Sequence, residues 1–151
     1  MGDLKEIQKL IPHRPPFLWV DRIMSCENGS IFTEKTIPAD LDIFKGHYPD
    51  NPLMPGVLLC EAVFQSGALL MAKTDFSNIS QSDTVPVLTR IGKAKFKRTV
   101  HPGDILQIKV EIKEIISNVC FLKGSIRVDQ KVAIQVEFAC SLINNTKQSN
   151  S

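Results

Sequence analysis

The stretch that decides the fold runs from Gly46 to Gln65 and reads GHYPDNPLMPGVLLCEAVFQ. From Gly56 to Ala72 nearly every residue is apolar or small, a pattern typical of a helix that is buried on all sides. Glu61 lies inside this run, and Gln65 follows one turn later on the same helix face. Because a carboxylate in apolar surroundings is costly, it is usually paired, protonated or functional. We therefore expect a long core helix that carries one acidic side chain.

Strands are predicted both before and after this helix in the sequence. Apolar residues alternate with polar ones in Leu106–Lys113 and again in Val132–Leu142, which indicates antiparallel strands with one face on a core. A turn at Asp129-Gln130 is expected to join the last two long strands. Phe17–Ile23 and Ser30–Ile37 are predicted to form two shorter strands.

Boundary signals between these elements complete the outline. Asp3 is a predicted N-cap for a short first helix, because Glu6 three residues later allows a capping box. Pro55 suits the first position of the long helix, since its missing N–H group costs nothing there. Lys73–Val85 is polar and is predicted to be a surface loop, and residues 144–151 form a polar C-terminal tail.

These elements predict a single α+β domain over residues 1–143. One apolar helix needs cover on most of its sides, and roughly five or six amphipathic strands are available to provide it. A curved antiparallel sheet wrapped around a long central helix satisfies both requirements. A chain of 151 residues is long enough for one domain with a full hydrophobic core.

Composition argues against several functions and locations. The net charge of +2 is too small to indicate a nucleic-acid partner. The apolar run is shorter than a membrane span and contains a carboxylate, so no membrane segment is predicted. The four cysteines are widely spaced and three lie in apolar patterns, which favours a reducing compartment. With no signal peptide read at the N-terminus, we expect a cytoplasmic protein.

Three groups near the start of the long helix have the properties of an acid–base site. His47 lies in a proline-rich loop near the positive end of the helix, where a neutral imidazole could act as a general base. Desolvation favours the protonated form of Glu61, which could then donate a proton. The backbone N–H groups of Gly56 and Val57 could bind a polarised carbonyl oxygen. Each group alone has an ordinary structural explanation. Together they suit removal of a proton beside a carbonyl while a leaving hydroxyl is protonated.

Other chemistries lack their motifs. His13, His47 and His101 do not have the spacing of metal ligands, so no metal site is expected. The chain contains no GxSxG elbow, HExxH motif, GxGxxG motif or P-loop. No nucleotide cofactor is therefore predicted.

A run of cations leaves two interpretations open. The lysines from position 93 onward alternate with apolar residues, which predicts that their charges share one face of a strand. Such a face is either simply solvated or a docking surface for an acidic macromolecule. The cations concerned are Arg90, Lys93, Lys95, Lys97 and Arg98.

Several sequence blocks, in the same order, resemble the FabZ type of 3-hydroxyacyl-[acyl-carrier-protein] dehydratase. The resemblance covers about residues 8–142, nearly the whole predicted domain. The blocks are Ile11-Pro12-His13-Arg14-Pro15-Pro16-Phe17-Leu18-Trp19-Val20-Asp21-Arg22, Gly46-His47-Tyr48-Pro49, Met54-Pro55-Gly56-Val57-Leu58, Glu61-Ala62, Lys95-Phe96-Lys97-Arg98 and Pro102-Gly103-Asp104.

This resemblance implies a hotdog fold in which two protomers form one continuous sheet, and three such dimers commonly assemble. It implies an active site in a tunnel at the dimer interface, with His47 from one protomer and Glu61 from the other. His47 would remove the C2 proton of the acyl thioester, and Glu61 would assist loss of the C3 hydroxyl as water. The Gly56 N–H group would polarise the thioester carbonyl.

The resemblance also implies a partner and a pathway. The substrate would be carried on the 4′-phosphopantetheine of an acyl carrier protein, and no metal or organic cofactor would be used. The product would be a trans-2-enoyl thioester in fatty-acid or specialised lipid elongation. Because the carrier is acidic, it gives the basic run a purpose.

Three residues are expected to line the substrate tunnel: Tyr48, Phe64 and Gln65. Phe64 stands where the family usually has a small residue, so it could narrow the tunnel and alter the preferred chain length. Tyr48 is the only tyrosine, so an aromatic gate after the helix would have to come from another residue such as Phe76. A cis Tyr48–Pro49 peptide bond is a further prediction.

Two other functions remain open. A hotdog thioesterase would use a carboxylate and a positioned water to release a free thiol. A non-catalytic acyl-binding subunit would have lost its acid or its base. The presence of both His47 and Glu61 favours elimination of water over these alternatives.

Overall fold

A computed structural model describes residues 3–74 and 84–144 of the chain. Within these ranges, two α-helices, one short 3-10 helix and six strands follow one another. In chain order they are α1 (Leu4–Leu10), β1 (Arg22–Glu27), β2 (Ser30–Thr36), η1 (Asp42–Lys45), α2 (Gly56–Lys73), β3 (Thr84–Phe96), β4 (Ile105–Ile116), β5 (Val119–Val128) and β6 (Lys131–Asn144).

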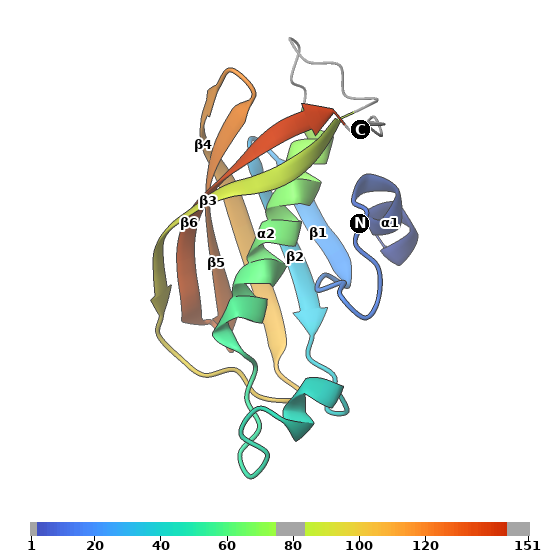
Figure 1. Cartoon of the computed structure of the whole chain (residues 1–151), viewed down its shortest axis with the longest axis vertical. Coiled ribbons are helices and arrows are strands. Elements are labelled where there is room, and N and C mark those ends of the chain that lie inside the picture. Colours follow the sequence, from blue (N-terminus) through green and yellow to red (C-terminus); the bar gives the residue numbers. More distant parts are fainter. Residues whose placement is uncertain (1–2, 75–83, 145–151) are drawn as a thin grey trace, which may run out of the picture.

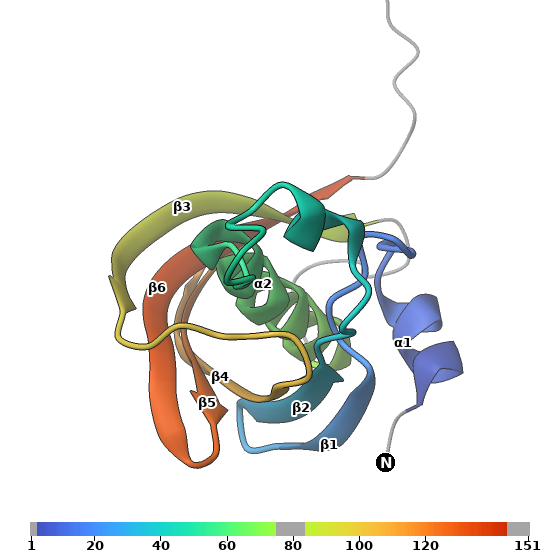
Figure 2. The ribbon, with the colours of Figure 1, turned by 90° about the horizontal axis from the view of Figure 1, so that it is seen from below.

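The strands form one antiparallel sheet in the order β1-β2-β4-β5-β6-β3. The sheet curves around α2, which lies along its inner side, and α1 packs beside β1 and α2 (Figures 1 and 2). β1 and β3 are the two edge strands. The predicted α+β fold, a curved antiparallel sheet around a long central helix, is confirmed.

The core lies between α2 and the inner face of the sheet. Every residue from Ala62 to Met71 is buried, and the helix packs against inward-facing residues such as Val110, Leu122 and Phe138. By length and composition alone α2 could span a membrane, but 67% of it is buried inside the fold. It is therefore the core helix of the domain, because a buried helix needs apolar residues all round.

The prediction of burial on all sides is wrong for the first two turns of α2. Val57 is 75% exposed, and the side chain of Glu61 is 23% exposed. The sheet covers the rest of the helix and leaves this stripe open. Pro55 is the N-cap and not the first helical residue, and its carbonyl accepts the N–H groups of Leu58 and Leu59.

The predicted strand at Phe17–Ile23 is also wrong, since β1 begins only at Arg22. Residues 18–20 are nevertheless buried, which explains their apolar pattern. The N–H group of Trp19 bonds to the side chain of Gln65 in α2 and not to a neighbouring strand. An irregular segment has been drawn into the core because a helix side chain satisfies its backbone.

Three local predictions are confirmed. Asp3 caps α1, and its carboxylate accepts the N–H group of Glu6 at 3.1 Å. β2 occupies Ser30–Thr36. The turn between β5 and β6 lies at Asp129-Gln130, where the two residues have φ angles of 50° and 68°. Positive φ at both positions is what a tight hairpin turn between twisted strands requires.

The Tyr48–Pro49 peptide bond is trans, so the prediction of a cis bond there is wrong. The cis bond in the described chain joins Pro15 to Pro16. Tyr48 itself turns the loop with a φ of 58°, and its carbonyl accepts the N–H group of Asn51 at 2.9 Å. The sharp turn is thus made by the backbone of Tyr48.

The boundaries of the predicted loop and tail need adjustment. Lys73 still belongs to α2, and β3 already begins at Thr84, one residue before the predicted end of the loop. Asn144 belongs to β6 and not to the tail. Residues 75–83 of the predicted loop, including Phe76, and residues 145–151 of the tail lie outside the described residues.

The glycine at position 124 in β5 provides a test of core packing. An added Cβ would collide with Cγ1 of Val63 and come within 3.3 Å of Cγ2 of Val110. Both valines are buried in a close-packed core and cannot move aside freely. We expect Gly124→Ala to lower the free energy of unfolding by about 1–3 kcal/mol, measured by urea denaturation. Gly46→Ala is the control, since no atom lies within 4 Å of its added Cβ. Equal stability of the two variants would contradict this packing.

The four cysteines are free thiols, and Cys60, Cys120 and Cys140 are buried. Burial raises the pKa of Cys120 to about 11, and burial with Cys120 nearby raises the pKa of Cys140 to about 12. A raised pKa keeps a thiol protonated at neutral pH, whereas only the thiolate reacts. In native protein at about pH 8, we expect a thiol reagent to modify Cys26 first and to spare Cys120 and Cys140 until denaturant is added. Mass spectrometry of digests measures this order, and modification of all sites at one rate would refute it.

Candidate active site

Glu61 lies in the second turn of α2, at the edge of the open stripe of the helix. Its Oε2 atom accepts a hydrogen bond from Nε2 of Gln65 at 3.1 Å. Nε2 of His13 lies 3.7 Å from the same oxygen. One carboxylate oxygen therefore faces Gln65 and His13, and the other has no hydrogen-bond partner among the described residues.

Gln65 fixes the direction of this contact. Its side chain is 1% exposed, its Oε1 accepts the N–H group of Trp19 at 2.7 Å, and its Nε2 donates to the carbonyl of Phe17 at 2.9 Å. A backbone N–H group can only donate and a carbonyl can only accept, so the amide cannot be turned over. Nε2 must face Glu61. Gln65, predicted to line the tunnel, holds the acid in place within the single protomer.

His47 follows η1 in the loop that leads to α2. Its Nδ1 atom lies 2.8 Å from the carbonyl oxygen of Leu53. Because a carbonyl oxygen only accepts, Nδ1 carries the proton and Nε2 keeps its lone pair in the neutral ring. Tyr48 packs edge-on against the imidazole with ring centroids 4.8 Å apart. This tautomer leaves Nε2 available as a proton acceptor.

The N–H groups of Gly56 and Val57 begin α2. Within the described residues neither donates a hydrogen bond, as expected for the first residues of a helix. The glycine also has a packing role, because an added Cβ would lie 2.8 Å from Cε1 of Phe96. The structure therefore leaves a pair of free donors there, and it explains the glycine by an aromatic contact without any ligand.

Phe64 and Tyr48, the other predicted tunnel residues, have very different surroundings. Phe64 is 9% exposed, and its ring packs against Phe138 of β6 with centroids 4.9 Å apart. Tyr48 is 63% exposed at the surface of its loop. Within one protomer, Phe64 is part of the core, whereas Tyr48 is free to contact another molecule.

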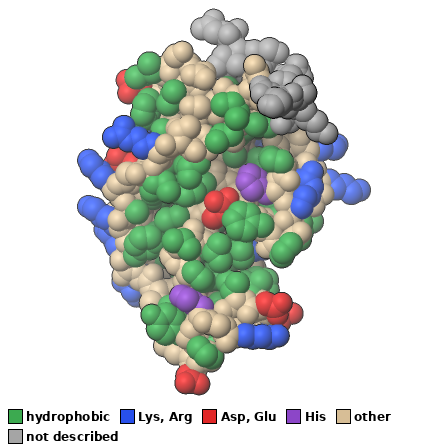
Figure 3. Space-filling view, viewed as in Figure 1, with side chains coloured by type: hydrophobic (Ala, Val, Ile, Leu, Met, Phe, Trp, Pro, Cys, Tyr) green, Lys and Arg blue, Asp and Glu red, His purple; other side chains and the backbone are tan. Residues whose placement is uncertain are grey.

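The predicted acid and base do not meet within one protomer. No hydrogen bond or ion pair joins His47 to Glu61 in the described part of the chain. The face in front of α2 is largely apolar, with acidic and histidine side chains set into it (Figure 3). The exposed apolar residues of the molecule include Val57, Ile91 and Phe96.

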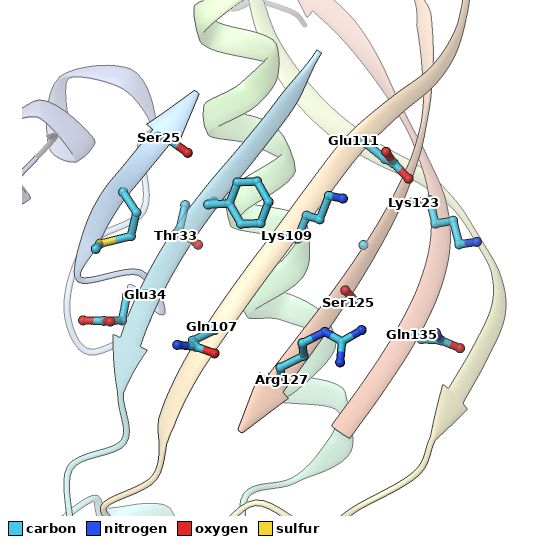
Figure 4. A pocket seen from close by; sticks show the side chains of 13 residues that line it. Ser25, Thr33, Glu34, Gln107, Lys109, Glu111, Lys123, Ser125, Arg127 and Gln135 are labelled. Carbon is cyan, nitrogen blue, oxygen red and sulfur yellow. The ribbon is translucent and has the colours of Figure 1, made fainter. Parts of the chain in front are cut away.

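One cavity formed by the described residues contains none of these groups. It has a volume of about 660 Å³ and lies on the outer side of the sheet, away from α2 (Figure 4). Its lining includes Lys109, Lys123, Ser125 and Arg127, but no histidine. This cavity has no group suited to be the predicted base, so its size does not make it the active site.

The basic run does not occupy one face of β3, contrary to its alternating pattern. Irregular pairing between Gly92 and Lys95 breaks the alternation, and Lys93 has a φ of 36°. Arg90 and Lys93 line a depression of about 480 Å³ with Lys113 and Lys123. The depression of about 500 Å³ that contains Lys97 and Arg98 is a separate one. Lys97 and Arg98 follow the end of β3, and Lys95 lines neither depression, so the five cations do not gather in one depression.

Sequence reasoning placed Gln65 beside Glu61 but missed the other neighbour, His13. His13 was noted as part of a matching block and as lacking metal-ligand spacing, and no spacing rule connects it with Glu61. Nδ1 of His13 is buried and has no hydrogen-bond partner among the described residues. Within the same residues, no group of three or more His, Cys, Asp or Glu side chains is arranged to hold a metal ion.

Comparisons with known proteins agree with this fold. A FabA-like domain matches residues 11–137. The 3-hydroxyacyl-[acyl-carrier-protein] dehydratase FabZ of Campylobacter fetus subsp. fetus is 37% identical over 147 residues, covering 95% of this chain and 99% of that protein. The FabZ of Petrotoga mobilis is 38% identical over 135 residues, covering 89% and 94% of the two chains.

Solved structures show the same architecture at low identity. A dehydratase heterocomplex from Xenorhabdus doucetiae superposes with a TM-score of 0.77 at 13% identity over 93% of both chains. A thioesterase-like protein from Ralstonia eutropha superposes with a TM-score of 0.63 at 19% identity, covering 79% of this chain and 82% of the other. At such low identities, these two structures support only the hotdog fold. The sequence matches go further, because they extend over nearly the full length of both partners: the chain belongs to the FabA-like family and, within it, to the FabZ-type 3-hydroxyacyl-[acyl-carrier-protein] dehydratases.

Proposed function

We propose that this hydro-lyase converts a 3-hydroxyacyl thioester into the trans-2-enoyl thioester with His47 as base and Glu61 as acid. The observation that carries the assignment of roles is the hydrogen bond from Nδ1 of His47 to the Leu53 carbonyl at 2.8 Å. In the neutral ring this contact leaves the lone pair on Nε2, as a base requires. Glu61 carries its protein contacts on Oε2, so its acid proton belongs on Oε1.

The reaction follows from these two protonation states. Nε2 of His47 takes the C2 proton, and the electron pair of the broken C–H bond forms the C2–C3 double bond. The C3–O bond breaks, and the hydroxyl leaves as water with the proton from Oε1 of Glu61. The N–H groups of Gly56 and Val57 stabilise the negative charge on the thioester oxygen while the proton leaves. The elimination of water causes no net oxidation or reduction, so the step needs no redox partner.

A second copy of the chain completes the site in this proposal. β3 is an edge strand of 13 residues, and its unpaired backbone can continue the sheet into a partner. Exposed Ile91 and Phe96 lie on this strand, and exposed Val57 on α2 follows Gly56, which lies against the ring of Phe96. Burial of these side chains in a dimer removes apolar surface from water. His47 then acts with the partner's Glu61, and three such dimers form the assembly expected for the family.

The acyl chain would lie in the space between the two protomers. Tyr48 stands at the entrance beside His47, and Phe64 stands further along α2. The ring of Phe64 is held by Phe138, whose own ring lies against Gly67 with no room for a Cβ. Such a packed aromatic pair cannot swing aside, which favours a shorter acyl chain than a small residue at this position would allow.

The substrate would arrive on the 4′-phosphopantetheine of an acyl carrier protein in the cytoplasm. Arg90, Lys93 and Lys95 on β3, and the following Lys97 and Arg98, are all exposed. Their positive charge suits an acidic carrier, because complementary charge speeds encounter and fixes orientation. Fatty-acid elongation or a specialised lipid pathway would use the product.

A paired assay tests the reaction and the two catalytic groups. A short 3-hydroxyacyl thioester is supplied, and enoyl-thioester absorbance and free thiol are followed together. We expect an enoyl signal without thiol release, reduced about 10²–10⁴-fold in His47→Ala and in Glu61→Gln because each loses a proton-transfer group. His101→Gln, in a different loop, is the control. Thiol release without enoyl formation would mean a thioesterase and would reject the proposal.

Mixing the two inactive variants tests the shared site. In a dimer of His47→Ala with Glu61→Gln, one site has both intact groups only if they come from different protomers. Random mixing then restores about one quarter of the wild-type activity, because half of the dimers are mixed and each has one intact site. Co-expression followed by the enoyl assay measures this. If both groups belonged to the same protomer, every site would be damaged and no activity would return.

A further inference from the structure

The loop after α1 brings one histidine, His13, close to Glu61 within the same protomer. Nε2 of His13 lies 3.7 Å from Oε2 of Glu61, although the two residues are far apart in the sequence. Arg14 holds this loop in place through Nη1, which donates to the carbonyls of Ile11 and His13 at 2.8 Å, and Nη2, which donates to that of Gln8 at 2.7 Å. The position of His13 is therefore fixed by the loop that carries it.

The surroundings of the imidazole determine which nitrogen carries its proton. Nε2 faces a carboxylate oxygen, which accepts hydrogen bonds. Nδ1 is buried and no described residue offers it an acceptor. A proton on Nδ1 would be an unsatisfied buried donor, which is costly. The neutral ring with its proton on Nε2 avoids a buried unsatisfied donor, since Nδ1 then carries only a lone pair, and it directs the N–H group toward Glu61.

We propose that His13 is a positioning residue that donates from Nε2–H to Oε2 of Glu61. The distance of 3.7 Å is longer than a hydrogen bond and closes to one when substrate and the partner subunit complete the site. Gln65 already donates to the same oxygen. Two donors on Oε2 confine the acid proton to Oε1, the oxygen that is free to face the C3 hydroxyl. This inference rests on the proposed dehydration.

Removal of the His13 donor is expected to lower kcat and to leave KM nearly unchanged. Loss of the His13 donor leaves Gln65 as the one donor to Oε2, so the carboxyl group of Glu61 rotates more readily and is protonated more often on the oxygen that cannot reach the substrate. The fraction of enzyme with a correctly placed proton then falls, and kcat falls with it. His13 does not touch the substrate in this arrangement, so KM stays nearly unchanged.

Two substitutions of similar polarity distinguish the effect of the donor at Nε2 from the effect of losing the imidazole ring. In His13→Gln the amide nitrogen falls near the position of Nε2, and in His13→Asn it falls near that of Nδ1. With the enoyl assay, we expect His13→Asn to lower kcat about tenfold, the effect of one hydrogen bond to a carboxyl group, with KM within about twofold. His13→Gln restores kcat to within about threefold of wild type. His101→Asn is the control for a histidine in a different loop.

The outcomes separate this role from the others. Equal kcat in wild type, His13→Gln and His13→Asn would overturn the positioning role while leaving the dehydratase assignment intact. An equal loss in both variants, with a lowered melting temperature, would assign His13 to stability and also overturn it. A wild-type protein that forms no enoyl product from thioester or from the carrier-bound substrate would overturn the proposed function, and the role of His13 with it.

Discussion

The hydrogen bonds of the buried Gln65 amide are the interactions on which the candidate site depends. This amide satisfies the backbone of Phe17 and Trp19, and it donates to Glu61 at the same time. Without it the segment before β1 would bring unpaired backbone groups into the core, at about 1–3 kcal/mol each. The same bonds that let an irregular segment enter the core therefore also fix the acid. Fold and site share one side chain.

A second constraint is that one sheet covers only part of a helix. The strands bury α2 from Ala62 onward, while Val57 and Glu61 remain at an open stripe. β3 has an unpaired edge beside this stripe. In the proposed dimer the same surface supplies both the apolar contact and the second half of the site. An acid near such an interface loses contact with water when the partner arrives, which strengthens each remaining electrostatic contact.

The regular spacing of apolar residues predicted the helix and strands whose burial follows a regular pattern. The central helix, β4, β6 and the turn at Asp129-Gln130 follow from apolar spacing and turn residues, and the order of matching blocks indicated the family. The segment at Phe17–Ile23 was mistaken for a strand because its burial depends on a side chain 46 residues away from Trp19. The alternation of β3 failed at an irregularity between Gly92 and Lys95 that no residue pattern announces. His13 beside Glu61 belongs to the same class, a contact made by tertiary structure alone.

The proposed acid and base are organised by one rule. In each, the protein engages one polar atom and leaves the other free: the Leu53 carbonyl takes Nδ1 of His47, and Gln65 takes Oε2 of Glu61. The Leu53 carbonyl can only accept a hydrogen bond, so Nδ1 of His47 must donate. The backbone groups bonded to Gln65 fix which end of its amide faces Glu61. The base therefore presents a lone pair and the acid presents a proton. Elimination of water needs this pairing, whereas hydrolysis of a thioester has no use for a base directed at C2.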